Sequence, residues 1–247
     1  NDIVALFPAA LAIYMIIKKR PLLCGFLLGL ATLGKGFPIL LLIPALIEFT
    51  DIEDRFKLVS ATMITLLSAS LPFIIVNPFT YMSTFTHHAS RGPWETLWAL
   101  IDGYYSHGGL LHPYFDKFFY HFNLLKIYPL SPYDHAIYKW RFGWMPDLLT
   151  LGQIVIIVVL SLAYKRWKSN IVSLCGFLYI SNMFFFKGYS TQFSVSTQFY
   201  TLLAAADKPL LFLVPLELSH IIQMFSWFSQ GIAPEFLRNE HLLLLAS

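Results

Sequence analysis

Residues 58–76 read LVSATMITLLSASLPFIIV, an apolar run without a charged side chain that stops at Asn77-Pro78. A helix of about 20 apolar residues crosses the roughly 30 Å hydrocarbon core of a bilayer. Residues 148–164 form a second run of this kind, and it ends in the basic cluster Lys165-Arg166-Trp167-Lys168. Both runs therefore predict membrane-spanning helices.

The composition of the whole chain agrees with this prediction. Of the 247 residues, 57% are hydrophobic and 13% are charged, whereas about 25% are charged in an ordinary soluble domain. The mean hydropathy is +0.62. The net charge of +3 is dispersed, without the basic stripe that nucleic-acid binding needs. We expect an integral membrane protein and no nucleic-acid partner.

Other apolar segments flank these two runs. They are residues 3–17, 22–49, 171–186 and 209–228, together with a half-polar segment at 187–206 and a long aromatic and polar stretch at 79–145. The pattern predicts an all-α, polytopic fold in one transmembrane domain over residues 1–247, with about seven helical segments and one large loop at 79–145. The chain begins at Asn1-Asp2, directly before an apolar helix. We therefore expect an N-terminally truncated piece of a longer protein.

The basic clusters set the expected orientation. Lys18-Lys19-Arg20 and the cluster at 165–168 should both be cytoplasmic by the positive-inside rule. Segment 22–49 is interrupted at Gly34-Lys35-Gly36-Phe37-Pro38, and each half, at about 20 Å, is too short to cross alone. One crossing would put the clusters on opposite sides. A broken, hairpin-like pair would put both inside and the 79–145 loop outside the cytoplasm, and we favour this arrangement.

Lys35 is the first candidate site residue. An ammonium between two apolar half-helices is costly to bury, so it should face a cavity or meet an anion. Lysine binds phosphate as a point charge, and the helix break, the lysine and Pro38 coincide. The alternative is a lysine that extends to the lipid headgroups.

The second candidate is the stretch from His87 to Glu95, just past the membrane exit. Arg91 can hold a phosphate through its planar guanidinium, and His87 or His88 can donate to it or act as an acid or base. Trp94 can stack on a sugar and Glu95 can bind a sugar hydroxyl. Each of these residues alone is also typical of a membrane interface.

A third stretch, Lys187-Gly188-Tyr189-Ser190-Thr191-Gln192, follows an apolar span. Lys187, Tyr189 and Gln192 can line the same cavity as Lys35, or the stretch is an ordinary turn between helices. No metal-ligand spacing is present, so no metal is expected. Cys24 and Cys175 lie in apolar segments and are expected to be buried and inert.

These three stretches, in this order, resemble the GT-C superfamily of glycosyltransferases. More narrowly, the run from Gly29 to Pro38 is similar to the polyprenol-phosphate-mannose-dependent mannosyltransferase branch, in which a small-residue helix ends in Lys-x-x-Pro. The second stretch resembles that branch's loop after the following span. The third resembles its Ser-Pro-Gln motif, except that Thr191 stands where proline is usual.

The resemblance implies a glycosyltransferase that moves a hexose, mannose first among them, from a polyprenyl-phosphate donor to an acceptor hydroxyl on a lipid or glycan. It implies an active site facing outward from the plasma membrane, and no cofactor. Lys35, Arg91 and His87 or His88 would bind the donor phosphate. The family's general base lies in an earlier extracytoplasmic loop, before Asn1, so no catalytic base is assigned and the isolated chain is expected to be inactive.

Two other functions fit the same pattern. A broken helix with a charge in the membrane also occurs in secondary transporters of small anions or sugars, although the chain has no repeated halves. A structural membrane subunit, with interfacial anchors in place of a site, is the other alternative. Sugar transfer from a lipid-linked donor distinguishes the enzyme from both.

Overall fold

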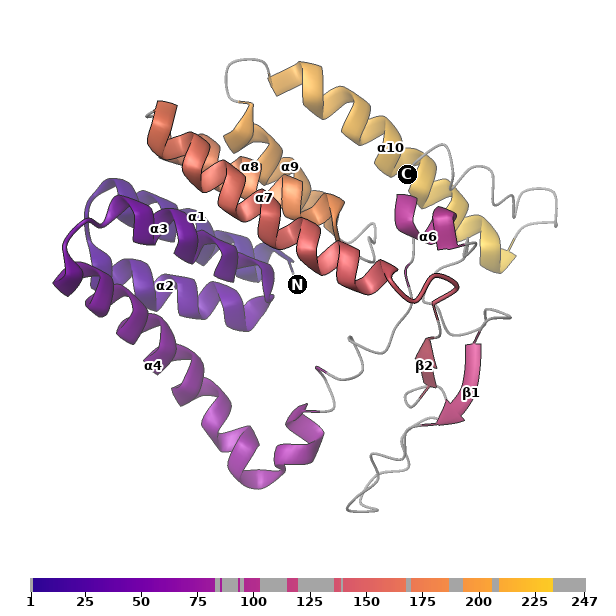
Figure 1. Cartoon of the computed structure of the whole chain (residues 1–247), viewed down its shortest axis with the longest axis horizontal. Helices are drawn as coiled ribbons and strands as arrows, with labels where there is room; N and C mark the ends of the chain where they lie inside the picture. Colours follow the sequence, from indigo (N-terminus) through magenta and orange to yellow (C-terminus); the bar gives the residue numbers. More distant parts are fainter. Residues whose placement is uncertain are drawn as a thin grey trace. The chain divides into compact units, whose positions relative to one another are not determined.

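Every apolar segment predicted from the sequence contains a helix (Figure 1). The computed structural model describes residues 2–82, 85, 93, 96–102, 115–119, 136–138, 140–167, 170–186, 193–205 and 209–232. The helices are α1 (Asp2–Ile17), α2 (Pro21–Gly34), the 3-10 turn η1 (Phe37–Leu41), α3 (Leu42–Glu48), α4 (Ile52–Val76), α6 (Leu97–Asp102), α7 (Met145–Trp167), α8 (Ile171–Phe184), α9 (Ser194–Ala204) and α10 (Pro209–Ile232).

The 79–145 stretch also contains a feature that the helical pattern did not predict. Strand β1 (Phe115–Phe119) pairs antiparallel with β2 (Ala136–Tyr138), with Phe115 opposite Tyr138 and Phe119 opposite Ala136. The register shifts between these two pairs. The all-α prediction therefore holds for the apolar segments, and a short ribbon is added within the long polar stretch.

The chain divides into two compact units. The first comprises residues 1–72, 152–184 and 192–216, and the second comprises 73–151, 185–191 and 217–247. In the first unit α1 pairs with α2, α8 pairs with α9, and η1 contacts α1, α2, α3 and α8. These helices form the core that positions Lys35.

The α1–α2 hairpin packs through small side chains. Ala5, Ala9 and Ala12 are buried on one face of α1, at the spacing of three and four residues that places side chains on the same helix face. The hairpin turns at Lys19, whose φ of 54° is left-handed. The backbone N–H groups of Lys19 and Arg20 bond the carbonyls of Ile16 and Met15, which is the Schellman arrangement that ends many helices.

Glycines allow other helices to approach closely. A Cβ at Gly25 would overlap the carbonyl oxygen of Leu58, and one at Gly29 would overlap the Thr65 side chain. The two glycines are four residues apart, so α2 presents a G-x-x-x-G face to α4, as membrane helices often do. On α8, a Cβ at Gly176 would overlap the backbone of α9.

Among the described residues, two helices are long and apolar enough to cross a membrane. They cover Ile52–Val76 (25 residues) and Met145–Arg166 (22 residues). Shorter apolar helices cover residues 3–17, 21–34, 37–48, 171–184 and 210–222. The two long helices are largely exposed. In the most apolar 18-residue stretch of each helix, only 11% and 6% of the residues, respectively, are buried.

One boundary differs from the sequence prediction. The apolar run that predicts this helix begins at Leu58, but α4 already begins at Ile52. Glu53 and Asp54 occupy its first turn, where negative charge is stabilised by the helix dipole. Charged residues at this end therefore extend the helix, and they do not interrupt it.

Candidate functional site

The predicted break in segment 22–49 is present at Lys35. Helix α2 ends at Gly34, and Lys35 follows in extended backbone, with its N–H bonded to the carbonyl of Ala31. Gly36 then starts η1 with φ −60° and ψ −28°, a conformation open to any residue. Gly34 has a packing role, because a Cβ there would press on Ala5 of α1. The two half-helices thus meet at a lysine.

The side chain of Lys35 lies half-buried against aromatic rings. Its ammonium is 4.1 Å from the ring centroid of Phe193 and 6.0 Å from that of Phe37. These two rings meet edge to face at 5.3 Å. A cation over a ring face gains about 0.5–2 kcal/mol, more as water is excluded. The ammonium is therefore oriented by the rings at the helix break.

Behind these rings lies the core of the first unit. Phe37 meets Tyr179 edge to face at 6.0 Å, and Tyr179 stacks on Tyr200 at 3.9 Å. We call Phe37, Tyr179, Phe193 and Tyr200 the aromatic cluster. The hydroxyl of Tyr200 is buried without a hydrogen-bond partner among the described residues. Rigid packing of this kind fixes where the Lys35 ammonium can lie.

Helix α9 also brings buried hydroxyl groups to this region of the fold. Ser196, Thr197 and Thr201 are each less than 8% exposed, and the Thr197 hydroxyl donates to the carbonyl of Phe193 at 3.0 Å. This bond fixes the first turn of α9, whose N-cap residue is Phe193. A polar stripe on a helix of the core agrees with the prediction that segment 187–206 is half polar.

Most of the predicted site residues lie outside the part of the chain that the structure describes. These are His87, His88, Arg91, Trp94, Glu95, Lys187, Tyr189 and Gln192. Lys35 is described, and its ring partner Phe193 directly follows Gln192 in the sequence. In the second unit, the rings of Trp98 and Phe185 stack with their centroids 6.0 Å apart. Trp98 follows the His87–Glu95 stretch in the sequence, and Phe185 precedes the 187–192 stretch. The sequence did not indicate that Phe193 is the partner of Lys35 or that Phe185 is the partner of Trp98.

A polar contact that was not predicted lies where α2 begins and α3 ends, away from the helix break at Lys35. The Lys19 ammonium lies 2.6 Å from Oε1 of Glu48 and donates to the Glu48 carbonyl oxygen at 2.9 Å. The Tyr164 hydroxyl donates to Oε2 at 2.9 Å. Both basic clusters, at 18–20 and 165–166, therefore lie at one end of the first unit, which we call the basic end. This is the arrangement expected of a hairpin-like pair.

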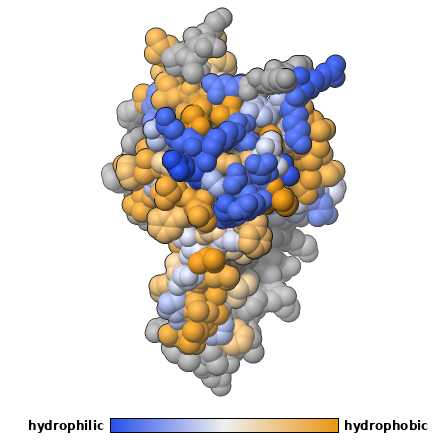
Figure 2. Space-filling view, turned by 90° about the vertical axis from the view of Figure 1, so that its left-hand side faces the viewer, coloured by the Kyte–Doolittle hydropathy of each residue, from blue (hydrophilic) through white to orange (hydrophobic). Residues whose placement is uncertain are grey.

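Hydrophilic side chains are also concentrated on the surface at the basic end. Figure 2 looks onto the side where the α1–α2 turn and the start of α4 lie, and hydrophilic side chains gather there with hydrophobic ones around them. Lys35 lies at the other end of α2, whose 14 residues correspond to about 20 Å of helix. The basic end and the helix break are thus separated by most of the length of the hairpin.

No protein-family model, curated protein or solved structure matches the chain. Both cysteines are free and buried, as expected. Within the described residues, no three His, Cys, Asp or Glu side chains are grouped in a way that could hold a metal ion.

Proposed function

We propose that the chain is an integral membrane glycosyltransferase. It transfers a hexose, mannose in the first instance, from a polyprenyl-phosphate donor to a hydroxyl of a lipid or glycan acceptor. The transfer takes place on the extracytoplasmic side of the plasma membrane. The observation that carries the proposal is Lys35, a half-buried cation at a helix break with its ammonium 4.1 Å from the Phe193 ring, far from the basic end.

Membrane insertion is supported by the exposure of the two long helices. A core helix of a soluble protein would bury its apolar residues, yet Ile64, Leu67 and Phe73 of α4 are 63%, 54% and 66% exposed. On α7, Leu151 and Leu162 are 57% and 61% exposed. Apolar surface of this extent needs a cover, and lipid chains provide one. The glycine contacts between α2 and α4 are also typical of helices in a bilayer.

The orientation follows from the basic end. Lysines and arginines near membrane helices are concentrated on the cytoplasmic side, so the clusters at 18–20 and 165–166 would face the cytoplasm. Helix α4 leaves this end and α7 returns to it, so residues 77–144 connect their far ends. At about 20 Å from the basic end, Lys35 would lie in the outer part of a core roughly 30 Å thick.

The chemistry explains why cations are needed there. The acceptor oxygen attacks the anomeric carbon, a base takes its proton, and the bond from that carbon to the phosphate oxygen breaks with inversion. Charge grows on the departing polyprenyl phosphate, so fixed cations stabilise the transition state more than the bound donor. We assign Lys35, Arg91 and His87 or His88 to this role. Trp94, Glu95, Lys187, Tyr189 and Gln192 are proposed to bind the sugar and the acceptor.

The test is mannose transfer from polyprenyl-phosphate-mannose in membranes that contain the full-length protein. Lys35→Ala and Arg91→Ala should each lower the rate by on the order of 100-fold, and Lys35→Arg should keep part of it. Lys18→Ala is the matched control, because the Lys18 ammonium also lies over a ring, that of Tyr14 at 5.4 Å, but at the basic end. It should leave the rate unchanged.

Other outcomes would change the assignment. Transfer that survives both Lys35→Ala and Arg91→Ala would make these residues interfacial anchors. A protein that transfers no sugar but drives uptake of a sugar or small anion into vesicles along an ion gradient would be a transporter, since a broken helix pair is compatible with that function too.

A further inference from the structure

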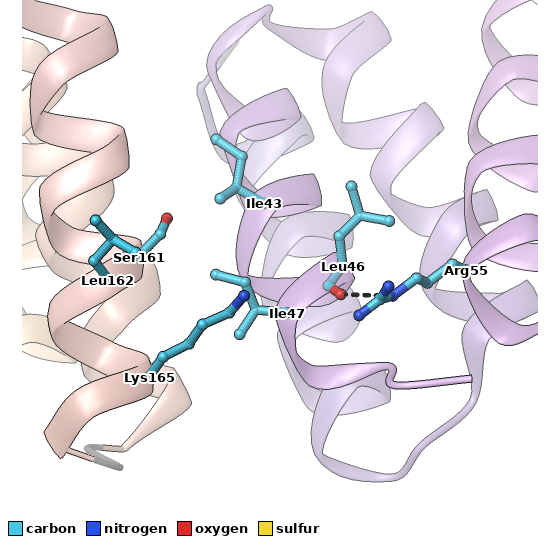
Figure 3. Close-up of a pocket in the computed structure, with 7 residues that line it drawn as sticks. All are labelled: Ile43, Leu46, Ile47, Arg55, Ser161, Leu162 and Lys165. Carbon is cyan, nitrogen blue, oxygen red and sulfur yellow. Dashed lines mark hydrogen bonds between the residues drawn. The ribbon is translucent and has the colours of Figure 1, made fainter. Parts of the chain in front are cut away.

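A pocket of about 380 Å³ opens at the basic end of the first unit, between α3 and α7 (Figure 3). Its walls are largely aliphatic, with Ile43, Leu46 and Ile47 from α3 and Leu162 from α7. The volume is within the range of small-molecule sites, roughly 300–1,000 Å³. The pocket is open on one side, and Leu162 is 61% exposed, so its wall continues onto the apolar face of α7.

Two cationic side chains, Arg55 and Lys165, are among the residues that line this pocket. Arg55 is held in place because its Nε donates to the carbonyls of Leu46 and Phe49, at 3.1 and 2.7 Å. The remaining guanidinium N–H groups have no acceptor among the described residues. In Figure 3, Lys165 extends from α7 toward α3, and within the described part of the chain its ammonium has no acidic partner. The nearby Glu48 is already paired with Lys19.

A hydroxyl group completes the polar set. The Ser161 Oγ lies on the pocket wall one helical turn from Lys165, and this buried oxygen has no hydrogen-bond partner in the described residues. A hydroxyl buried in this way costs about 1–3 kcal/mol unless a ligand or water meets it. Two cations and a donor hydroxyl between aliphatic walls suit an anion that carries hydrocarbon.

We propose that this pocket binds the phosphate of an anionic phospholipid, with the acyl chains along the exposed apolar face of α7. Basic pockets between membrane helices on the cytoplasmic side recognise lipid headgroups in this way. Inorganic phosphate would gain nothing from the aliphatic walls, so the structure favours a lipid over a free anion. The proposal rests on the membrane insertion argued above but does not depend on sugar transfer.

The test measures lipid binding to the detergent-purified full-length protein by native mass spectrometry. Phosphatidylglycerol should bind more tightly than phosphatidylcholine with the same acyl chains. Lys165→Gln should weaken phosphatidylglycerol binding about five-fold, since one lysine near a lipid phosphate contributes about 1 kcal/mol. Lys165→Arg should restore it, and Ser161→Ala should weaken it less. Arg166→Gln removes a charge one position along α7, outside the pocket, and should have little effect.

Three results would overturn the proposal. Equal losses in Lys165→Gln and Arg166→Gln would mean that diffuse charge attracts the lipid. Equal binding of the two lipids would mean that no anion is recognised. Displacement of the lipid by inorganic phosphate would mark a site for free anions. Unchanged melting temperatures establish that the variants are folded, and lipid binding without sugar transfer would remove the proposed enzyme while leaving this site.

Discussion

Glu48 joins three segments that lie far apart in the sequence. Its carboxylate meets Lys19 of the α1–α2 turn and the hydroxyl of Tyr164, which is 116 residues away. The hydrogen bond from Lys19 holds the pKa of Glu48 below its usual value, against a smaller opposing effect of burial, and the Tyr164 hydroxyl adds to the lowering. The ionised form is therefore the one that holds the basic end together.

This arrangement predicts how stability depends on pH. Because the pKa of Glu48 is lower in the folded protein, its stabilising effect is complete above the unfolded value of about 4.3. It is lost as the pH falls through the folded value. Glu48→Gln should lower the apparent melting temperature in detergent at pH 7. The difference between the variant and the wild type should shrink as the pH drops below about 4.3.

A second carboxylate provides the control. Glu53 forms an ion pair with Lys57 at 2.6 Å, but its side chain is 76% exposed, and exposed pairs contribute little. Glu53→Gln should therefore leave the melting temperature almost unchanged at both pH values. If it destabilised the protein as much as Glu48→Gln, the loss of a negative charge would explain both effects, and the contact with Lys19 and Tyr164 would not.

Helices α8 and α9 approach each other closely at Gly176. A Cβ at this position would overlap the backbone N of Ala204 and the carbonyl oxygen of Tyr200. Neither atom can move without shifting α9, because both belong to its backbone. Overpacking of this kind costs about 1–3 kcal/mol. Gly176→Ala should therefore lower the apparent melting temperature by roughly 2 to 12 °C.

Gly143 offers a matched substitution, because a Cβ there would meet nothing within 4 Å. Gly143→Ala should melt like the wild type. A Gly176→Ala protein that also melts like the wild type would mean that α8 and α9 do not approach as closely as described. The same displacement of α9 would move Phe193, so the Gly176 variant should also slow the sugar transfer proposed above.

The helices and the break were predictable because each depends on local sequence. Long apolar runs fix the helices, and Gly34-Lys35-Gly36 with Pro38 fixes the interruption, since a proline two residues into a segment favours a new helical start. The start of α4 at Ile52 lies before the apolar run, because Glu53 and Asp54 carry no apolar signal although the helix dipole stabilises them in a first turn. The β1–β2 ribbon has only a weak local signal among scattered aromatic residues.

Contacts between residues far apart in the sequence were not predicted. Lys35 was recognised as a candidate because a lysine in an apolar segment is unusual, but nothing in its neighbourhood indicates that Phe193 supplies the ring beneath it. Glu48 was overlooked because a lone carboxylate at the end of an apolar segment is normally solvated. The pocket with Arg55 and Lys165 requires α3 and α7 to meet, and periodicity within each helix does not contain that information.

The proposed membrane orientation of α4 and α7 can be tested in the full-length protein. Cys24 and Cys175 are 0% exposed, so within residues 1–247 a thiol reagent should react only with a cysteine introduced at the surface. Asp51 precedes α4 at the basic end and Gly143 precedes α7 at its far end, and both are exposed. In intact cells a membrane-impermeant maleimide should label Gly143→Cys, and it should label Asp51→Cys only after permeabilisation.

Labelling of Asp51→Cys alone would place the basic end outside, against the positive-inside rule, and would move the proposed active site to the cytoplasm. Labelling of both without permeabilisation would mean that α4 and α7 do not cross the membrane, and both the enzyme and the lipid site would then need another explanation for the exposed apolar surface.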